Sequence, residues 1–146
     1  MKKVLAIILA LVMALSLMAC GSSPAQQPGG DADTETPVVT DGATLGEGAH
    51  SFTLEIADAD GKTITATINT DEETVGAALL KLNIIQGENS DYGLYVKTVN
   101  GITADYDKDQ TYWSFYIDGE YAQTGVDMTA ITEGSTYKLA IETMEQ

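Results

Sequence analysis

Tyrosines and the single tryptophan gather in two segments that alternate apolar and polar residues. Tyr112, Trp113 and Tyr116 lie in the segment TYWSFYI, and Tyr95 lies in the segment LYVKTV. Aromatic rings offer a large contact area with a polar handle, which suits a planar or sugar-like ligand. These four residues are therefore the candidate ligand-binding residues. The competing interpretation is that tyrosines simply suit strands and cover a sheet.

Three aspartates at alternate positions suggest a second kind of chemistry. Asp105, Asp107 and Asp109 match the first three ligand positions of a calcium-binding loop. The rest of that loop is missing, because Gln110 stands where the sharp turn needs glycine and Tyr116 stands where the bidentate glutamate belongs. The three aspartates are thus a weak candidate calcium site, and the alternative is an ordinary solvated turn.

The first twenty residues have the pattern of a secretory signal. Lys2 and Lys3 precede an apolar run over 4–15 that is too short and wrongly flanked for a spanning helix. Cys20, directly after the small residue Ala19, resembles the bacterial lipobox. That resemblance implies cleavage before Cys20 and a diacylglycerol on its thiol, so we expect an extracytoplasmic protein anchored in the cell membrane. The alternative is an ordinary secretory signal with an accidental thiol.

Composition narrows the function further. Removal of residues 1–19 leaves 127 of the 146 residues, enough for one domain, with five lysines, 22 carboxylates and no arginine. The resulting formal charge of −17 repels nucleic acid, so we expect no nucleic-acid partner. His50 is the only histidine and lies beside a glycine-rich stretch, and no serine, threonine or lysine lies in a recognisable activating motif. We therefore expect that the protein is not an enzyme.

The chain divides into three parts. Residues 1–19 form the signal peptide, and residues 20–48, rich in proline, glycine and polar residues, are expected to form a lipidated, disordered tether. Residues 49–146 are expected to fold. Their periodicity predicts strands over 51–56, 63–68, 94–99, 111–117 and 136–141, and a shorter element within 121–131.

One helix is expected between these strands. Thr70 and Glu73 form a capping-box pattern, and the spacing of apolar residues predicts an amphipathic helix over 71–83. Residues 87–90 are expected to form a loop, and Asn100-Gly101 a tight turn. This order of elements predicts an α+β domain in which one helix packs on a mixed sheet. It is the order of a ubiquitin-like β-grasp fold.

Side chains on the strand 111–117 alternate between the two faces of the sheet. Trp113 belongs to the apolar face, which we expect to pack against the helix, so Trp113 is also a candidate core residue. Tyr112 and Tyr116 then stand on the open face, where Tyr95 joins them if its neighbours point inward. The sequence therefore predicts a tyrosine platform on the exposed sheet.

Several short motifs together resemble a known family. They are Thr74-Val75, Val99-Asn100-Gly101, the segment 112–120, Gly125-Val126 and the segment 133–137. The pattern is similar to bacterial extracytoplasmic domains that resemble the C-terminal β-domain of transcobalamin and intrinsic factor. The resemblance implies a β-grasp fold and a corrinoid such as cobalamin as ligand. The chain differs from those carriers because it lacks the large helical domain that supplies the other wall of their site.

These observations lead to two expected functions. The first is a lipid-anchored module that captures a small ligand, with a corrinoid as the candidate, and passes it to a membrane importer. The alternative is a structural or adhesive module that binds protein or glycan at the cell surface.

Overall fold

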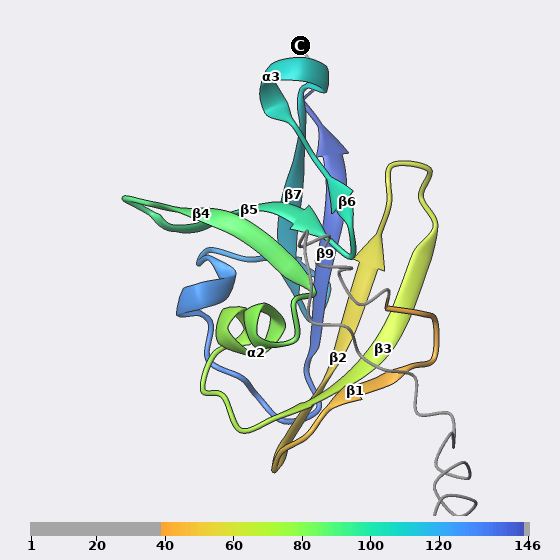
Figure 1. Cartoon of the computed structure of the whole chain (residues 1–146), viewed down its shortest axis with the longest axis vertical. Coiled ribbons are helices and arrows are strands. Elements are labelled where there is room, and N and C mark those ends of the chain that lie inside the picture. Colours follow the sequence, from red (N-terminus) through yellow and green to blue (C-terminus); the bar gives the residue numbers. More distant parts are fainter. Residues whose placement is uncertain (1–38, 145–146) are drawn as a thin grey trace, which may run out of the picture. The chain divides into compact units, whose positions relative to one another are not determined.

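The computed structural model describes residues 39–144, which form one mixed sheet, one smaller antiparallel sheet and a few short helices (Figure 1). The predicted signal peptide, the lipidation at Cys20 and most of the predicted tether lie outside these residues. The fold is mostly β, with one helix of seven residues, α2 (Val75–Lys81), which is consistent with the expected α+β class. In the described part of the chain, no helix is long and apolar enough to cross a membrane.

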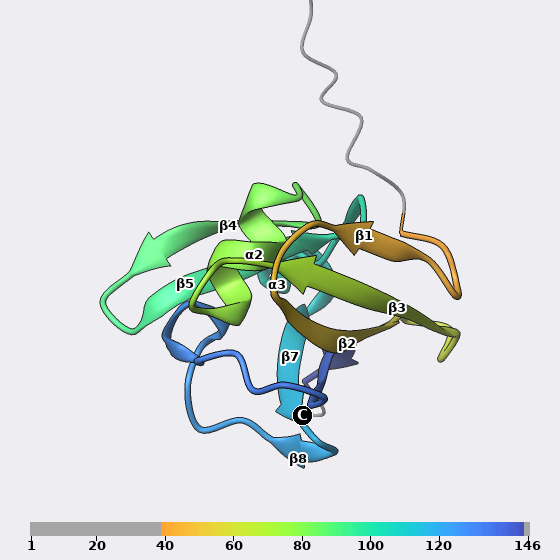
Figure 2. The same cartoon turned by 90° about the horizontal axis from the view of Figure 1, so that it is seen from below.

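The larger sheet has six strands in the order β1-β3-β2-β9-β7-β8. Its strands are β1 (Thr44–Gly46), β2 (His50–Ala57), β3 (Thr63–Thr70), β7 (Thr111–Ile117), β8 (Glu120–Tyr121) and β9 (Thr136–Thr143). The β1–β3 and β2–β9 pairs are parallel and the other pairs are antiparallel, so the sheet is mixed. Figure 2 shows β1, β3 and β2 as successive strands of a twisted sheet, and β7 follows beyond β9, which lies between β2 and β7.

A smaller antiparallel sheet contains β4 (Ile85–Ser90), β5 (Gly93–Val99) and β6 (Ile102–Thr103). The β4–β5 hairpin projects away from the larger sheet (Figure 1). Two short helices complete the fold: α3 (Tyr106–Asp109) precedes β7, and the 3₁₀ helix η1 (Val126–Met128) lies against α2.

The strand pattern read from the sequence is largely confirmed. The predicted hairpin is β2–β3, in which Phe52 pairs with Ile68 and Leu54 pairs with Ala66, and all four side chains are buried. Asn100 and Gly101 form the predicted turn, both with positive φ. The short element expected within 121–131 is η1, preceded by the end of β8.

The helix begins later than predicted. Thr74, not Thr70, is its N-cap, and the Thr74 hydroxyl accepts a hydrogen bond from the Ala77 N–H at 3.2 Å. Thr70 stays in β3, and its hydroxyl accepts from the Glu72 N–H at 3.0 Å instead. The same side-chain chemistry therefore stabilises a turn at Thr70, and the segment 71–74 connects β3 to α2 outside the helix.

Two other segments differ from expectation. Residues 87–90, predicted as a loop, belong to β4. Their side chains show no strand pattern, but their backbone pairs with β5 and thereby forms a strand. The described residues also include structure before the expected boundary at residue 49. Val39 is 2% exposed within the core, and β1 pairs with β3.

Three glycines allow α2, β5 and η1 to meet around Asp127. A Cβ on Gly76 would lie 2.7 Å from the Asp127 Cα, and a Cβ on Gly93 or Gly125 would lie 2.8 Å from the Asp127 Oδ1. A side chain at position 76 would collide with the backbone of η1, whereas one at position 93 or 125 would have to displace the Asp127 carboxylate. The helix thus makes its close contact through Gly76 with η1.

Candidate functional site

A hollow of about 370 Å³ lies between β5 and β7 and brings together three of the four predicted aromatic residues. We call it the aromatic hollow. It is lined by Ser90, Tyr92, Leu94, Tyr95, Val96, Tyr112, Trp113, Phe115, Tyr121, Ala122, Gln123, Thr124, Gly125, Val126 and Leu139. Its volume falls within the range of small-molecule sites, roughly 300–1,000 Å³.

The lining of the aromatic hollow contains no charged side chain, although one fifth of the chain is charged. β5 and β7 contribute apolar side chains to its lining, and Tyr92, Tyr121 and Gln123 contribute side chains that carry hydrogen-bonding groups. Burial of a charge without a partner is costly, so such a lining favours a neutral ligand or the neutral part of one. This composition is typical of a ligand pocket with few polar groups.

Trp113 lies in both the core and the wall of the aromatic hollow. The residue is 8% exposed, and its Nε1 is buried without a hydrogen-bond partner among the described residues. An unsatisfied buried donor costs about 1–3 kcal/mol. The sequence offered Trp113 as either a core residue or a ligand-binding residue, and the structure places it where both roles are compatible.

The rim of the aromatic hollow carries exposed tyrosines. Tyr92, at the turn between β4 and β5, is 89% exposed, and Tyr121 on β8 is 58% exposed. Large aromatic side chains with so much exposed area contribute little burial free energy to the stability of the fold. Their position makes Tyr92 and Tyr121 additional candidates for ligand contact, which the sequence analysis did not single out because no spacing relates them to β7.

Tyr112 and Tyr116 share one face of β7, as predicted, but their hydroxyls are occupied. Tyr112 donates a hydrogen bond to the Glu142 Oε2 at 3.0 Å, and Tyr116 donates to the Glu142 Oε1. Glu142 is the direct cross-strand partner of Tyr112 on β9. The ring of Tyr116 also meets that of Tyr121 edge-on at 5.5 Å.

This Tyr–Glu–Tyr cluster shifts the ionisation of its members. The hydrogen bond from Tyr116, and then that from Tyr112, holds the pKa of Glu142 below its ordinary value although burial opposes this. The same bonds, together with burial, raise the pKa of Tyr112 and of Tyr116. Two donors on one carboxylate fix both rings, so the cluster braces the outer face of β7 and β9. Tyr95 lies on the other sheet and is not part of it.

The structure does not gather the three aspartates into a cation site. Asp105 is the N-cap of α3, where its Oδ1 accepts from the N–H groups of Asp107 and Lys108, and its Oδ2 pairs with the Lys108 Nζ at 3.2 Å. Asp109 accepts from the Thr111 hydroxyl at 2.6 Å. Among residues 39–144, no group of three or more acidic, histidine or cysteine side chains is arranged to hold a metal ion. Asp105 and Asp109 are thus engaged in local hydrogen bonds at the two ends of α3.

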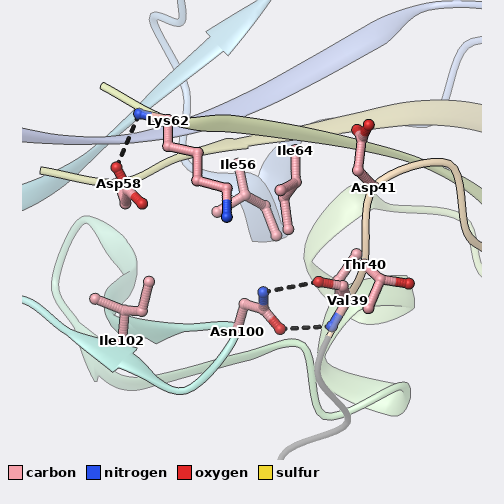
Figure 3. Close-up of a pocket in the computed structure, with 9 residues that line it drawn as sticks. All are labelled: Val39, Thr40, Asp41, Ile56, Asp58, Lys62, Ile64, Asn100 and Ile102. Carbon is pink, nitrogen blue, oxygen red and sulfur yellow. Dashed lines mark hydrogen bonds between the residues drawn. The ribbon is translucent and has the colours of Figure 1, made fainter. Parts of the chain in front are cut away.

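A second hollow, of about 360 Å³, is shown in Figure 3. Its aliphatic surface comes from Val39, Ile56, Ile64 and Ile102, and it holds none of the predicted aromatic residues. The Asn100 side chain closes one wall, because its Oδ1 accepts from the Val39 N–H at 2.6 Å and its Nδ2 donates to the Val39 carbonyl at 3.1 Å (Figure 3). This amide is therefore used to hold the start of the described chain, and we regard the aromatic hollow as the better candidate site.

Comparisons with known proteins agree with the fold. Residues 72–140 match the family model described as "Domain of unknown function (DUF4430)". A comparison with curated proteins finds no match. Among solved structures, the chain is similar to the crystal structure of a "putative metal binding protein from Ruminococcus gnavus ATCC 29149", with 28% identity and a TM-score of 0.63. That likeness covers 66% of this chain and 100% of the other.

The chain is also similar in fold to haptocorrin, whose crystal structure is a complex with Cbi, or cobinamide. The identity is 16% and the TM-score 0.53, and the likeness covers 65% of this chain but only 26% of haptocorrin. This finding supports the expected transcobalamin-like fold. The chain corresponds to about a quarter of that larger protein.

Proposed function

We propose that this protein is a ligand-binding module that holds the neutral part of its ligand in the aromatic hollow, with a corrinoid as the first candidate. The observation that carries the proposal is the uncharged wall around Trp113, whose buried Nε1 has no partner within the described residues. A ligand carbonyl at that wall would satisfy the indole N–H once the surrounding side chains adjust.

The corrinoid is favoured by the fold likeness to haptocorrin, which was crystallised with cobinamide. We further infer a β-grasp arrangement, supported by the parallel pairing of β2 with β9 at the centre of the sheet and by the helix that follows the β2–β3 hairpin. A hollow of about 370 Å³ covers only part of so large a ligand. The hollow therefore acts as one wall, and the ligand keeps an exposed side for transfer.

The proposed location follows from the sequence pattern at Cys20. We propose that the module is held outside the cell membrane by a lipid on Cys20 and that it passes its ligand to a membrane importer. An open, half-covering site suits this role, because the importer can contact the ligand before the module releases it. We propose no catalytic role for the protein.

Equilibrium dialysis of the full chain in detergent against cobinamide tests the proposal. Cobinamide should be retained in saturable, one-to-one fashion. Tyr92→Ser, which removes an exposed ring from the rim of the hollow, should weaken retention at least fivefold without changing the melting temperature. Tyr106→Ser is the control, since Tyr106 is another exposed tyrosine but lies outside the aromatic hollow. Absence of retention by folded protein would refute the proposal.

A further inference from the structure

A third hollow, of about 310 Å³, lies on the other side of β5 and has a different chemistry. It is bounded by β5, β6 and α3, and we call it the polar hollow. Two tyrosines border it: Tyr95 is 42% exposed and Tyr106 is 46% exposed. Neither hydroxyl has a hydrogen-bond partner among residues 39–144, so both rings and both hydroxyls are available to a ligand.

The remaining wall of the polar hollow supplies acceptors and donors. The carboxylate of Asp107 has no hydrogen-bond or ion-pair partner in the described part of the chain. Lys97 Nζ pairs with Glu88 Oε2 at 3.0 Å, and the Thr103 hydroxyl is 2.8 Å from that of Thr98. Carboxylates accept hydrogen bonds, ammonium groups donate them, and hydroxyls do both. The hollow thus offers both kinds of group around two aromatic faces.

Charge restricts what this hollow can take. Three carboxylates, those of Glu88, Asp105 and Asp107, line it against the single ammonium of Lys97, so anions are repelled. A metal ion is not indicated either, because the described residues contain no suitable group of ligands. The best match is a neutral ligand with many hydroxyls and an apolar C–H face.

We infer that the polar hollow binds a neutral saccharide, with Tyr95 and Tyr106 stacking on the sugar ring and Asp107 accepting from its hydroxyls. Sugar rings present C–H groups on their faces and hydroxyls at their edges, and an aromatic ring with a polar tip can meet both. This site is separate from the proposed corrinoid site, although Tyr95 borders both hollows. It would let the module attach to surface glycan.

Saturation-transfer-difference NMR on the full chain in detergent tests this inference with cellobiose, maltose, lactose and N,N′-diacetylchitobiose. At least one should receive saturation on its C–H protons, and glucuronate should receive none. Tyr106→Ser should reduce the signal at least fivefold, whereas Tyr92→Ser, which alters an exposed tyrosine outside the polar hollow, should leave it unchanged.

Three results would overturn the inference: no transfer to any of the four sugars, an unchanged signal in Tyr106→Ser, or an equal loss in Tyr92→Ser. The cobinamide dialysis gives an independent outcome, because it depends on Tyr92 and not on Tyr106. Either site can therefore fail while the other stands.

Discussion

Glu142 shows how a single carboxylate organises the outer face of the sheet. It accepts hydrogen bonds from Tyr112 and Tyr116, and these bonds hold its pKa below the ordinary value of 4.5. A carboxylate with a lowered pKa stabilises the fold above its unfolded-state pKa, and this stabilisation is lost as the pH falls through its folded-state pKa. The cluster should therefore contribute at neutral pH and fade in acid.

Glu142→Gln should lower the free energy of unfolding by about 1 kcal/mol at pH 7, because the two hydrogen bonds lose their charged acceptor. The difference from wild type should shrink as the pH falls from about 4.5 through the lower pKa of the folded state, where the wild-type carboxylate becomes protonated. Urea unfolding at a series of pH values measures both effects. Glu55→Gln is the control, since the Glu55 side chain, in β2, has no hydrogen bond or ion pair within residues 39–144. A difference that stays constant down to pH 2 would contradict this account.

Asn100 has a role that its turn position alone did not reveal. The Asn-Gly pair predicted a turn, but the Asn100 side chain also pairs with both backbone groups of Val39, 61 residues away. A side-chain contact over such a sequence distance leaves no periodic pattern. The sequence could predict the backbone at Asn100 and not its partner.

Asn100→Gly should release the start of the described chain while preserving the turn, because glycine accepts the positive φ of 50°. Loss of both hydrogen bonds should cost about 1 kcal/mol, so amide exchange over 39–46 should accelerate roughly fivefold. Hydrogen–deuterium exchange measures this directly. Asn83→Gly, at another asparagine with positive φ and no side-chain hydrogen bond in the described structure, should leave that segment unchanged. Equal acceleration in both variants would argue against the contact.

At the scale of elements, strands with a clear period of two were predictable and the segments that depend on partners were not. Residues 111–117 form β7 with the predicted bounds, because alternation alone specifies a half-buried strand. Residues 87–90 join β4 only because β5 offers a ladder. Of the four aromatic residues that the sequence selected, Tyr95, Tyr112 and Trp113 line the aromatic hollow and Tyr116 does not. The rim tyrosines and the Glu142 cluster depend on tertiary contacts, which the sequence pattern does not contain.

The contact between α2 and η1 gives a test in which helix propensity and packing oppose each other. In an exposed helix, Gly→Ala stabilises by about 1 kcal/mol. Gly76→Ala should instead destabilise by about 1–3 kcal/mol, because the new Cβ would lie 2.7 Å from the Asp127 Cα and must displace η1. Thermal unfolding measures the sign. Ala77→Gly is the control: it lowers helix propensity at the next position and should destabilise by about 1 kcal/mol. If Gly76→Ala instead stabilised the protein, α2 and η1 would not be in close contact.

At the scale of the whole molecule, two sheets leave two hollows on either side of β5, one uncharged and one polar. We propose that the uncharged hollow takes the neutral part of a corrinoid and that the polar hollow takes a saccharide. In this proposal the module is attached at the cell surface and captures its ligand there. The strongly acidic composition, with a formal charge of −15 for the full sequence, excludes polyanions from both.

The proposed attachment to a membrane depends on a lipid at Cys20. Cys20→Ser should abolish incorporation of radioactive palmitate in the producing bacterium and move the protein from the membrane fraction to the soluble fraction, because anchoring depends on the acyl chains. Labelling followed by fractionation tests this. Ser22→Ala, two residues away, is the control and should remain labelled. Retention of label in Cys20→Ser would contradict the proposed attachment.

The central claim, that the aromatic hollow is the ligand site, is tested most directly at Trp113. Because Trp113 is the only tryptophan, its indole N–H gives a single resonance in a ¹⁵N-tryptophan-labelled chain. We predict that cobinamide shifts this resonance saturably. The cobinamide concentration needed for half of the shift should be unchanged in Tyr106→Ser and higher in Tyr92→Ser. An indole resonance that does not move while dialysis shows bound cobinamide would place the ligand elsewhere and contradict the account.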